Sequence, residues 1–202
     1  MSYRLGCIIL AAGNSERYGS NKFVSAHPSG QSLLGYVVRQ YQSLSPLPVM
    51  VVSGGWHDAI RDLFFDTGQV TVQRNSNWQD GMSTSIHAGV NAFRNQHPDT
   101  THLLIGLGDQ AGVSERSLQP LVARSFLEQR RVIASQWGNN MGAPAVFPAP
   151  VWETLLTLSG DKGAHGLLQE WAARDKPLCL PVGHPEAAWD IDSPGDWAHS
   201  IP

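Results

Sequence analysis

The sequence predicts an α/β protein built on a three-layer, mostly parallel, doubly wound sheet of the Rossmann-like type. Short apolar runs alternate along the chain with segments whose apolar residues recur at helical spacing, which is the pattern of successive βαβ units. Polar loops follow several of these runs directly, at the sheet edge where doubly wound proteins bind their ligands. A chain of 202 residues suits one domain with a sizeable core, so we expect residues 1–202 to form a single domain.

The composition is that of a soluble globular protein, with 42% hydrophobic residues and a formal net charge of -3. This charge gives no reason to expect a nucleic-acid partner. No apolar run approaches membrane-spanning length, and the first residues lack the regions of a signal peptide, so we expect no membrane contact and a cytoplasmic location. Cys7 and Cys179 lie in apolar, strand-like runs, which indicates buried, reduced thiols rather than a disulfide.

The first two thirds of the chain carry the clearest alternation of strands and helices. Residues 5–10 are an apolar, branched run that predicts a buried parallel strand. The elements expected next are a helix over 32–44, a strand over 47–52, a short helix over 57–65, a strand over 70–73, a helix ending near 93, a strand over 102–107, a helix to about 129 and a strand over 131–137. Ser83 and Ser114 are the expected caps of the last two helices, because a serine hydroxyl accepts a backbone hydrogen bond there.

The remainder of the chain is less regular. A turn at 138–140 leads into an extended segment over 141–148, whose prolines favour a sheet edge or a cavity wall. We expect helices over 151–158 and within 159–168, and short strands over 178–182 and 188–191. Residues 193–196 (Ser-Pro-Gly-Asp) place a cap, a proline and an acid as at the start of a helix.

The loop that follows the first strand, residues 10–22, has the composition of a triphosphate-binding loop. Residues 11–13 (Ala-Ala-Gly) have small side chains that let a ligand approach the backbone N–H groups. Arg17 can bind a phosphate through two parallel hydrogen bonds, and Lys22 supplies a point charge. The lysine is misplaced for a Walker P-loop, and the dinucleotide pattern G-x-G-x-x-G is absent from the loop. On residue types alone, a flexible surface loop with two charges explains the stretch equally well.

Carboxylates in two places could bind a metal beside this loop. Asp109 directly follows the strand over 102–107, where a carboxylate faces the ligand crevice. Asp190 and Asp192 lie two residues apart, so strand alternation puts them on one face. Mg²⁺ takes carboxylate, phosphate and water oxygens at roughly 2.0–2.1 Å, which suits Asp109 with either partner. The alternative is that Asp109 is a turn residue and Asp192 part of a helix entry.

The loop also carries the pattern L-A-A-G-x-S-x-R-x-G-x-x-K. This pattern resembles the signature of the MobA-like NTP transferase family, which includes the molybdopterin cytidylyl- and guanylyltransferases. The positions that fall on the signature are Leu10, Ala11, Ala12, Gly13, Ser15, Arg17, Gly19 and Lys22. Guanylyl-type members tend to carry L-A-G-G, so L-A-A-G resembles the cytidylyl, or MocA-type, branch. The resemblance implies the nucleotidyltransferase fold and a nucleotide site in this loop.

The metal site is also implied by this resemblance. Residues 108–110 (Gly-Asp-Gln) are similar to the family's G-D-Q-P, whose Asp binds Mg²⁺, although Ala111 replaces the proline. Residues 190–196 are similar to its D-I-D-T-P-E-D, in which an Asp completes the site. The resemblance therefore implies Asp109 and Asp192 as ligands, with Asp190 as the second choice for the latter.

Two more segments are similar to family motifs for the nucleotide and the acceptor. Residues 75–85 resemble N-P-x-x-x-x-G-x-x-x-S, which implies that Gly81 and Ser85 lie against the base and ribose. Residues 159–168 resemble S-G-D-K-G-A-R-x-L-L, a segment near the acceptor pocket.

The sequence departs from the family pattern on the acceptor side. Ala143 stands where many cytidylyl members have histidine, and His165 stands where they often have arginine. The acceptor is therefore less well specified than the nucleotide. Two aromatic residues, Trp78 and Trp137, could line a pocket.

The resemblance implies a Mg²⁺-dependent nucleotidyltransferase that uses an NTP, with CTP favoured over GTP, and a phosphorylated small-molecule acceptor. Related enzymes suggest molybdopterin as the acceptor and a molybdenum hydroxylase as a client. Arg17 would bind the β- and γ-phosphates, Lys22 would neutralise charge at the α-phosphate, and Asp109 would hold the metal. The methyl groups of Ala11 and Ala12 would leave less room for a purine than for a pyrimidine.

Two alternatives stay open. One is a sugar-phosphate or polyol-phosphate nucleotidyltransferase on the same fold. The other is a non-catalytic carrier of the finished cofactor, which has no need for metal-binding carboxylates beside a triphosphate site.

Overall fold

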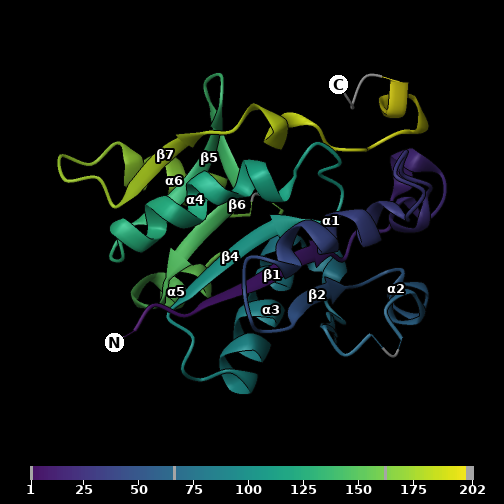
Figure 1. The fold of residues 1–202 in the computed structure, drawn as a ribbon, viewed down its shortest axis with the longest axis horizontal. Helices are drawn as coiled ribbons and strands as arrows, with labels where there is room; N and C mark the ends of the chain where they lie inside the picture. The colour runs from purple at the N-terminus through teal and green to yellow at the C-terminus, as the bar shows by residue number, and fades with distance from the viewer. Residues whose placement is uncertain (1, 66, 162, 199–202) are drawn as a thin grey trace.

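A mixed β-sheet with the strand order β3-β2-β1-β4-β6-β5-β7 organises the chain (Figure 1). The computed structural model describes residues 2–65, 67–161 and 163–198. The strands are β1 (Leu5–Ala11), β2 (Val49–Ser53), β3 (Val70–Arg74), β4 (His102–Leu107), β5 (Val132–Trp137), β6 (Asn140–Pro148) and β7 (Cys179–Gly183). Strands β1 to β4 pair in parallel, and β6 is antiparallel to both of its neighbours. The mostly parallel sheet predicted from the sequence is confirmed.

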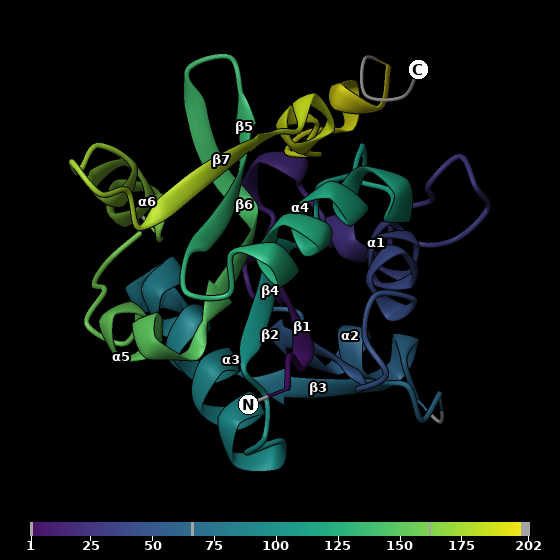
Figure 2. The same ribbon diagram turned by 60° about the vertical axis from the view of Figure 1, so that its left-hand side comes forward.

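Helices cover both faces of the sheet. The α-helices are α1 (Leu33–Gln42), α2 (His57–Leu63), α3 (Met82–Gln96), α4 (Glu115–Leu127), α5 (Trp152–Leu155) and α6 (His165–Ala172). Buried side chains of α1, α2 and α4 belong to one apolar cluster, and those of α3, α5 and α6 belong to a second. Figure 2 shows the resulting three layers, with α3, α5 and α6 on the left of the sheet and the other three on the right.

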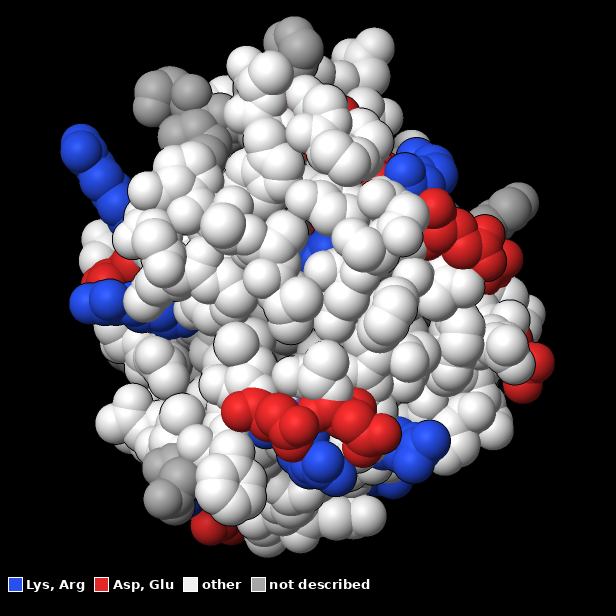
Figure 3. Space-filling view, turned by 90° about the vertical axis from the view of Figure 1, so that its right-hand side faces the viewer, with Lys and Arg blue, Asp and Glu red and all other residues white. Residues whose placement is uncertain are grey.

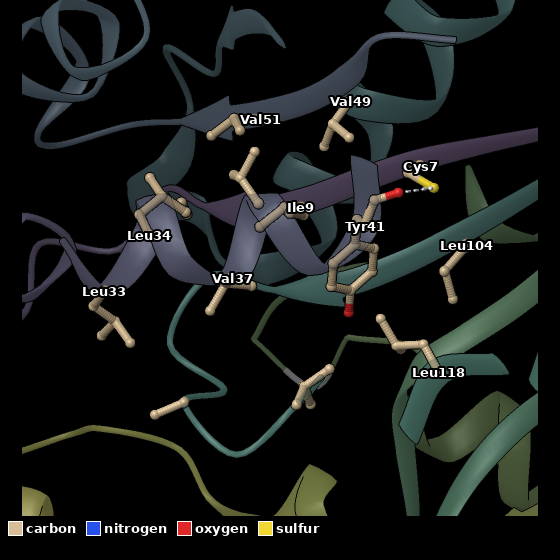
Figure 4. Packing of buried hydrophobic residues seen from close by; sticks show 14 of the residues in the cluster. Cys7, Ile9, Leu33, Leu34, Val37, Tyr41, Val49, Val51, Leu104 and Leu118 are labelled. Carbon is tan, nitrogen blue, oxygen red and sulfur yellow. Dashed lines mark hydrogen bonds between the residues drawn. The ribbon is translucent and has the colours of Figure 1, made fainter. Parts of the chain in front are cut away.

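β1 is the centre of the core because all seven of its residues are buried. Its side chains alternate between the faces: Ile9 packs in the cluster under α1, whereas Ile8 packs in the cluster under α3. Figure 4 shows Ile9 and Val51 facing α1. The thiol of Cys7 donates to the carbonyl oxygen of Tyr41 on that helix at 3.8 Å.

Both cysteines are buried and free, as expected. Burial raises the pKa of the Cys7 thiol to about 12 and does the same for Cys179, because a thiolate is poorly solvated in an apolar core. Neither thiol is therefore a candidate nucleophile at neutral pH.

Of the two positions expected for residues 141–148, the sheet edge is wrong and the cavity wall is confirmed, since Met141, Ala143 and Phe147 line a cavity. These residues form most of β6, which lies inside the sheet between β4 and β5. A register shift in β5 between Ala134 and Ser135 lies opposite Pro144, so the ladder does not need the missing N–H of the proline. The Ser135 hydroxyl instead donates to the Pro144 carbonyl oxygen at 2.7 Å.

Two local expectations are also wrong. Residues 188–191 form no strand: Ala188 ends a 3₁₀ helix, and only single backbone bonds join the segment to the loop after β4, such as Ile191 N–H to the Asp109 carbonyl oxygen at 2.9 Å. Ser83 does not cap α3, which begins one residue earlier at Met82. The cap position is Gly81, whose φ of 107° is in the region that favours glycine, and its lack of a side chain leaves the cap to the backbone.

Other expected starts are confirmed. Ser114 caps α4, where its hydroxyl accepts from Ser117 N–H at 3.2 Å. The carboxylate of Asp196 accepts from Ser193 N–H at 2.6 Å and fixes the start of a 3₁₀ helix, Pro194–Ala198. Over the residues that the structure describes, no helix has both the length and the apolar character that crossing a membrane requires.

Candidate nucleotide-binding site

The loop predicted to bind phosphate leaves the carboxyl end of β1 and is held by its own backbone. Ser15 has a φ of 60° and Gly19 a φ of 77°, and between them lies one 3₁₀ turn, Glu16–Tyr18. A second 3₁₀ turn, Lys22–Val24, begins after Asn21, whose side-chain oxygen accepts from Phe23 N–H at 3.1 Å. This second turn fixes the position from which the Lys22 side chain extends.

A cleft of about 830 Å³ lies along this loop. The sequence-predicted residues that line it are Leu10, Ala12, Gly13, Ser15, Arg17, Lys22, Gly81, Ser85, Asp109 and Asp192. Trp78, which the sequence suggested as a pocket residue, lines the cleft as well, and Trp137 lines a second cavity. Residues not assigned from the sequence are also in the cleft wall: Asn14, Glu16, Phe23, Gln79, Met82, Leu107 and Asp161. Segments that are far apart in the sequence thus form one cleft at one sheet edge, as the topology predicts.

Ala11 is the exception within the predicted loop. It is the last residue of β1, its side chain is 1% exposed, and it packs in the core cluster rather than in the cleft wall. Strand alternation is the cause, since Ala11 points to the same face as Ile9. Of the two alanines, Ala11 and Ala12, only Ala12 lines the cleft and brings its methyl group there.

Lys22 joins two carboxylates in the cleft. Its Nζ lies 2.7 Å from Asp109 Oδ2 and 3.1 Å from Asp192 Oδ1. The lysine side chain is only 9% exposed, so the pair of contacts is screened little by solvent. Burial alone would lower the pKa of Lys22, but the two carboxylates outweigh that effect and raise it, which keeps the ammonium charged.

Arg17 completes the cluster from the solvent side. A guanidinium nitrogen lies 2.7 Å from Asp192 Oδ2, while 76% of the arginine side chain stays exposed. The indole N–H of Trp197 donates to the hydroxyl of Tyr18 at 3.0 Å. Together with the contacts of Asp192 to Arg17 and Lys22, this bond joins the C-terminal segment to the loop, beside which it lies in Figure 1. Arg17 is thus positioned at the cleft mouth, where an exposed guanidinium can turn to a bound phosphate.

The carboxylates fit a divalent cation. Asp109 Oδ1 is buried and has no hydrogen-bond partner within the described part of the chain, and oxygens of Asp109 and Asp192 already converge on one positive charge. Among the described residues, no three His, Cys, Asp or Glu side chains converge on one point. Two carboxylates with phosphate and water oxygens are nevertheless an ordinary set for Mg²⁺.

Asp190 lines a second cavity, of about 280 Å³, rather than the cleft. Burial, together with the charges of Asp109 and Asp192, raises the pKa of Asp190. Asp190 and Asp192 therefore line neighbouring spaces, whereas the predicted strand would have put them on one face.

The second cavity is mostly apolar and adjoins the cleft at Leu10, Met82 and Leu107, which line both. Its other walls are Ile86, Ile105, Gln110, Trp137, Met141, Gly142, Ala143, Ala145, Phe147, Leu155, Gly163, Ala164, His165, Leu168, Ala187, Ala188 and Asp190. The two segments expected near an acceptor pocket, around Ala143 and His165, thus meet here. Lys162, which belongs to the second segment's motif, is outside the described residues.

Two polar side chains of this cavity are fixed by backbone carbonyls. Gln110 Nε2 donates to the carbonyl oxygens of Ala143 and Ala187, both at 2.9 Å, and holds β6 against the chain after β7. The His165 ring donates from Nδ1 to the Met141 carbonyl oxygen at 2.7 Å, which leaves Nε2 as the acceptor of the neutral ring. That the Gln110 side chain is buried could not be predicted from the sequence, because a polar residue in a loop is usually exposed.

The far wall of the cleft is organised by Asn75. Its side-chain nitrogen donates to Ser85 Oγ at 3.0 Å and to Thr84 Oγ1 at 2.8 Å, which holds the start of α3. A Cβ on Gly81 would lie 2.6 Å from the carbonyl oxygen of Gly160, so no side chain fits there. The segment expected near the base and ribose is therefore tightly packed.

Charge on the molecular surface is mixed. On the face shown in Figure 3, Lys and Arg side chains lie beside Asp and Glu side chains in small clusters. This arrangement is unlike the continuous basic surface that neutralises a nucleic-acid backbone.

Comparison with known proteins identifies relatives of this arrangement. The model of the MobA-like NTP transferase domain matches residues 7–176. A curated relative, the bifunctional protein GlmU of Pseudomonas syringae pv. tomato, is 32% identical over 126 residues, or 62% of this chain. The match spans about a quarter of that relative's length (26%).

Solved structures share the fold over nearly the whole chain. A nucleotidyl transferase from Methanothermobacter has a TM-score of 0.79 at 20% identity, with 98% of this chain and 95% of that chain covered. Rv0371c of Mycobacterium tuberculosis in complex with manganese has a TM-score of 0.72 at 22% identity, with 98% and 97% covered. The inositol-1-phosphate CTP transferase of T. maritima (TM-score 0.67, 16% identity, 97% and 92% covered) is similar too. So is molybdopterin-guanine dinucleotide biosynthesis protein A of Archaeoglobus fulgidus (0.66, 13%, 96% and 96%).

Proposed function

The chain belongs to the MobA-like NTP transferase family, and on that premise we propose that residues 1–202 form one Mg²⁺-dependent nucleotidyltransferase domain that uses CTP and cytidylylates molybdopterin. The observation that carries the proposal is the junction of the two spaces. A cleft with cationic side chains and paired carboxylates adjoins an apolar cavity, and Leu10, Met82 and Leu107 line both. A nucleoside triphosphate and an acceptor bound in these spaces would place their phosphates near each other.

In the proposed reaction an oxygen of the acceptor phosphate attacks the α-phosphorus of CTP. The new O–P bond forms as the bond to the bridging α,β-oxygen breaks, and pyrophosphate leaves. Such a transfer needs positioning and charge neutralisation more than covalent help from the protein. A bound Mg²⁺ would supply charge neutralisation of the triphosphate oxygens, held by Asp109 and Asp192.

Each charged side chain has a role that follows from its place. Lys22 is buried between the carboxylates and keeps a positive charge at the α-phosphate position, while Arg17 at the mouth binds the β- and γ-phosphates and the departing pyrophosphate. Ala12 and Gly13 expose backbone to the nucleotide, and Ser85 and Gly81 form the opposite wall. These roles agree with those implied by the loop signature.

The acceptor is inferred from the chemistry of the second cavity. Its wall is built from Met, Ile, Leu, Phe and Trp side chains with few polar groups. A sugar or polyol phosphate presents many hydroxyls, each of which needs a partner when it leaves water. A flat heterocycle such as a pterin suits this wall better, because its ring faces can pack on the apolar side chains while its polar edge meets the few polar side chains. A molybdenum hydroxylase as client and a cytoplasmic location follow from the same proposal.

A non-catalytic carrier is the alternative of another class. A carrier does not require Lys22 and two carboxylates beside a triphosphate loop. Release of pyrophosphate separates the two classes, since only the enzyme produces it.

A nucleotide screen by thermal shift tests the proposal. CTP with Mg²⁺ should raise the melting temperature more than GTP with Mg²⁺, and EDTA should reduce the shift. A ligand that binds only the folded state at 100 times its Kd adds roughly 2.7 kcal/mol of stability. An absence of any shift with all nucleotides would overturn the proposed function.

A further inference from the structure

The cleft wall combines charged and aromatic side chains. Lys22, Arg17 and the carboxylates are charged, and Trp78, which lies against Gly54 and Gly55, is aromatic. A nucleoside triphosphate has two matching parts, an anionic tail and a flat base. An aromatic side chain is a group on which bases of any sequence stack.

The Trp78 side chain is fixed by the backbone that follows β2. A Cβ on Gly54 would lie 2.7 Å from Cβ and Cγ of Trp78, and a Cβ on Gly55 would lie 3.3 Å from its Cζ2. Both glycines therefore leave room for the indole to lie along the chain at these two residues. The side chain is half-buried, so one part packs on the protein and another faces the cleft.

The same backbone is tied to the phosphate loop. Gly55 N–H donates to the Ala12 carbonyl oxygen at 3.1 Å, and the indole N–H of Trp56 donates to the Asn14 carbonyl oxygen at 2.8 Å. These two hydrogen bonds therefore fix the position of the wall that carries Trp78 relative to the loop that carries Arg17 and Lys22. A base against the indole would place its triphosphate along that loop.

We propose that Trp78, seated on Gly54 and Gly55, is the surface on which the nucleobase stacks, and that it contributes to affinity for the base but not for the phosphates. The inference rests on the proposed function, because it assumes that a nucleoside triphosphate occupies the cleft. The opposing interpretation is that Trp78 only packs β2 against the 3₁₀ turn Trp78–Asp80. That interpretation predicts no difference between ligands with and without a base.

Calorimetric titration separates the two interpretations. CTP with Mg²⁺ and, separately, inorganic tripolyphosphate with Mg²⁺ are titrated into the wild type, Trp78→Ala and Trp78→Phe. We expect Trp78→Ala to bind CTP about 5- to 100-fold more weakly than the wild type while tripolyphosphate binding stays within twofold. Trp78→Phe should keep most of the CTP affinity, since phenylalanine still offers a ring. Phe126→Ala, which removes an exposed aromatic side chain of α4 that lines neither space, is the matched control and should bind CTP like the wild type.

The outcomes that overturn the inference are distinct. Equal losses for CTP and tripolyphosphate in Trp78→Ala would assign the residue a structural role, and unchanged CTP affinity would remove it from the site. A wild type that binds tripolyphosphate but not CTP would overturn the proposed function as well. If Trp78→Ala does not fold, the tryptophan fluorescence of the wild type and of Trp78→Phe takes the place of the titration. CTP should quench tryptophan emission in the wild type and lose most of that quenching in Trp78→Phe, and equal quenching in both would contradict the inference.

Discussion

Lys22 and Asp109 are 87 positions apart in the sequence, and their side chains meet at 2.7 Å in the cleft. The lysine comes from the loop after β1 and the aspartate from the loop after β4, two neighbouring parallel strands. Their contact, extended to Asp192, brings three segments to one point. The predictions below test what this cluster and its surroundings do.

Substitution of Asp109 by Asn should abolish turnover and leave the fold intact. The change keeps the shape of the side chain but removes a charge from the metal-binding pair. Loss of a residue that only orients a ligand already costs about 10- to 100-fold, so removal of a direct ligand should cost at least about 100-fold in kcat/KM. Pyrophosphate release measures the loss, and Mn²⁺ binding followed by electron paramagnetic resonance should weaken in parallel.

Asp99→Asn is the control for this variant, because Asp99 is an exposed carboxylate that also pairs with a cation, Arg4. It should match the wild type in both measurements. Wild-type activity of Asp109→Asn at limiting Mg²⁺ would remove the metal role.

Substitution of Arg17 by Lys should reduce kcat/KM for the nucleotide although the charge is kept. An ammonium cannot reproduce the two parallel hydrogen bonds of a guanidinium, and a hydrogen bond to a charged group contributes about 1.5–3 kcal/mol, which corresponds to about 10- to 100-fold. Steady-state kinetics with CTP checks the loss. Arg94→Lys, which changes an ion pair with Glu153 away from the cleft, should be silent. If both variants were silent, the β- and γ-phosphate role would pass to Lys22.

The base preference should depend on Ala12 and not on Ala11. CTP should be used better than GTP, since an added methyl group in a packed wall costs about 1–3 kcal/mol for the larger base. Ala12→Gly should narrow the difference in kcat/KM between CTP and GTP, because loss of the methyl group leaves more room for the base. Ala11→Gly should instead lower the melting temperature and leave the CTP to GTP ratio of kcat/KM unchanged, because Ala11 packs in the core. A wild type that uses both nucleotides equally would contradict this account of specificity.

Stability should fall in mild acid because of His184, which is 1% exposed and bonded through Nδ1 to Ser135 Oγ at 2.8 Å and through Nε2 to Ser117 Oγ at 2.9 Å. Burial lowers the pKa of His184 below 6.5, against a smaller opposing effect of Glu186. The unfolded chain therefore takes up the proton first as the pH falls through 6.5, and the free energy of unfolding decreases by at most about 1.4 kcal/mol per pH unit for this one group.

Urea unfolding of the wild type and His184→Gln between pH 7.5 and 5.5 measures that dependence. The quantity compared is the slope of the free energy of unfolding against pH. The absolute free energy of unfolding is not compared, because the variant also loses hydrogen bonds. His27 and His102 have lowered pKa values too and set a background slope common to both proteins. Identical slopes would show that His184 does not titrate as described.

Much of the fold could be predicted because its signals are local. β1 is a short apolar run bounded by polar residues, and Ser114 caps α4 through contacts within four residues. The position of β6 could not be predicted, because the proline rule concerns the missing N–H, and Pro144 lies where the pairing of β5 with β6 shifts register, which depends on how the two strands meet. The segment 188–191 alternates like a strand, yet its backbone bonds go to the loop after β4.

The residues of the candidate site likewise differ in whether local sequence signals predict their positions. Arg17, Lys22 and Asp109 could be chosen because they are charged residues in loops that follow the buried strands β1 and β4, and such loops lie at the ligand edge. The different placement of Ala11 and Ala12 depends on where β1 ends, which a pattern does not specify to one residue. The separation of Asp190 from Asp192 into neighbouring spaces depends on long-range packing, and so does the position of Trp78 against Gly54.

The most direct test of the central claim is turnover with the proposed substrates. Purified protein is mixed with CTP, Mg²⁺ and molybdenum-loaded molybdopterin, and pyrophosphate and the modified pterin are quantified by enzymatic assay and mass spectrometry. The account predicts one pyrophosphate for each cytidylylated pterin, with neither product formed by Asp109→Asn or in EDTA. Tight binding of the pterin without release of pyrophosphate would contradict it and favour a carrier.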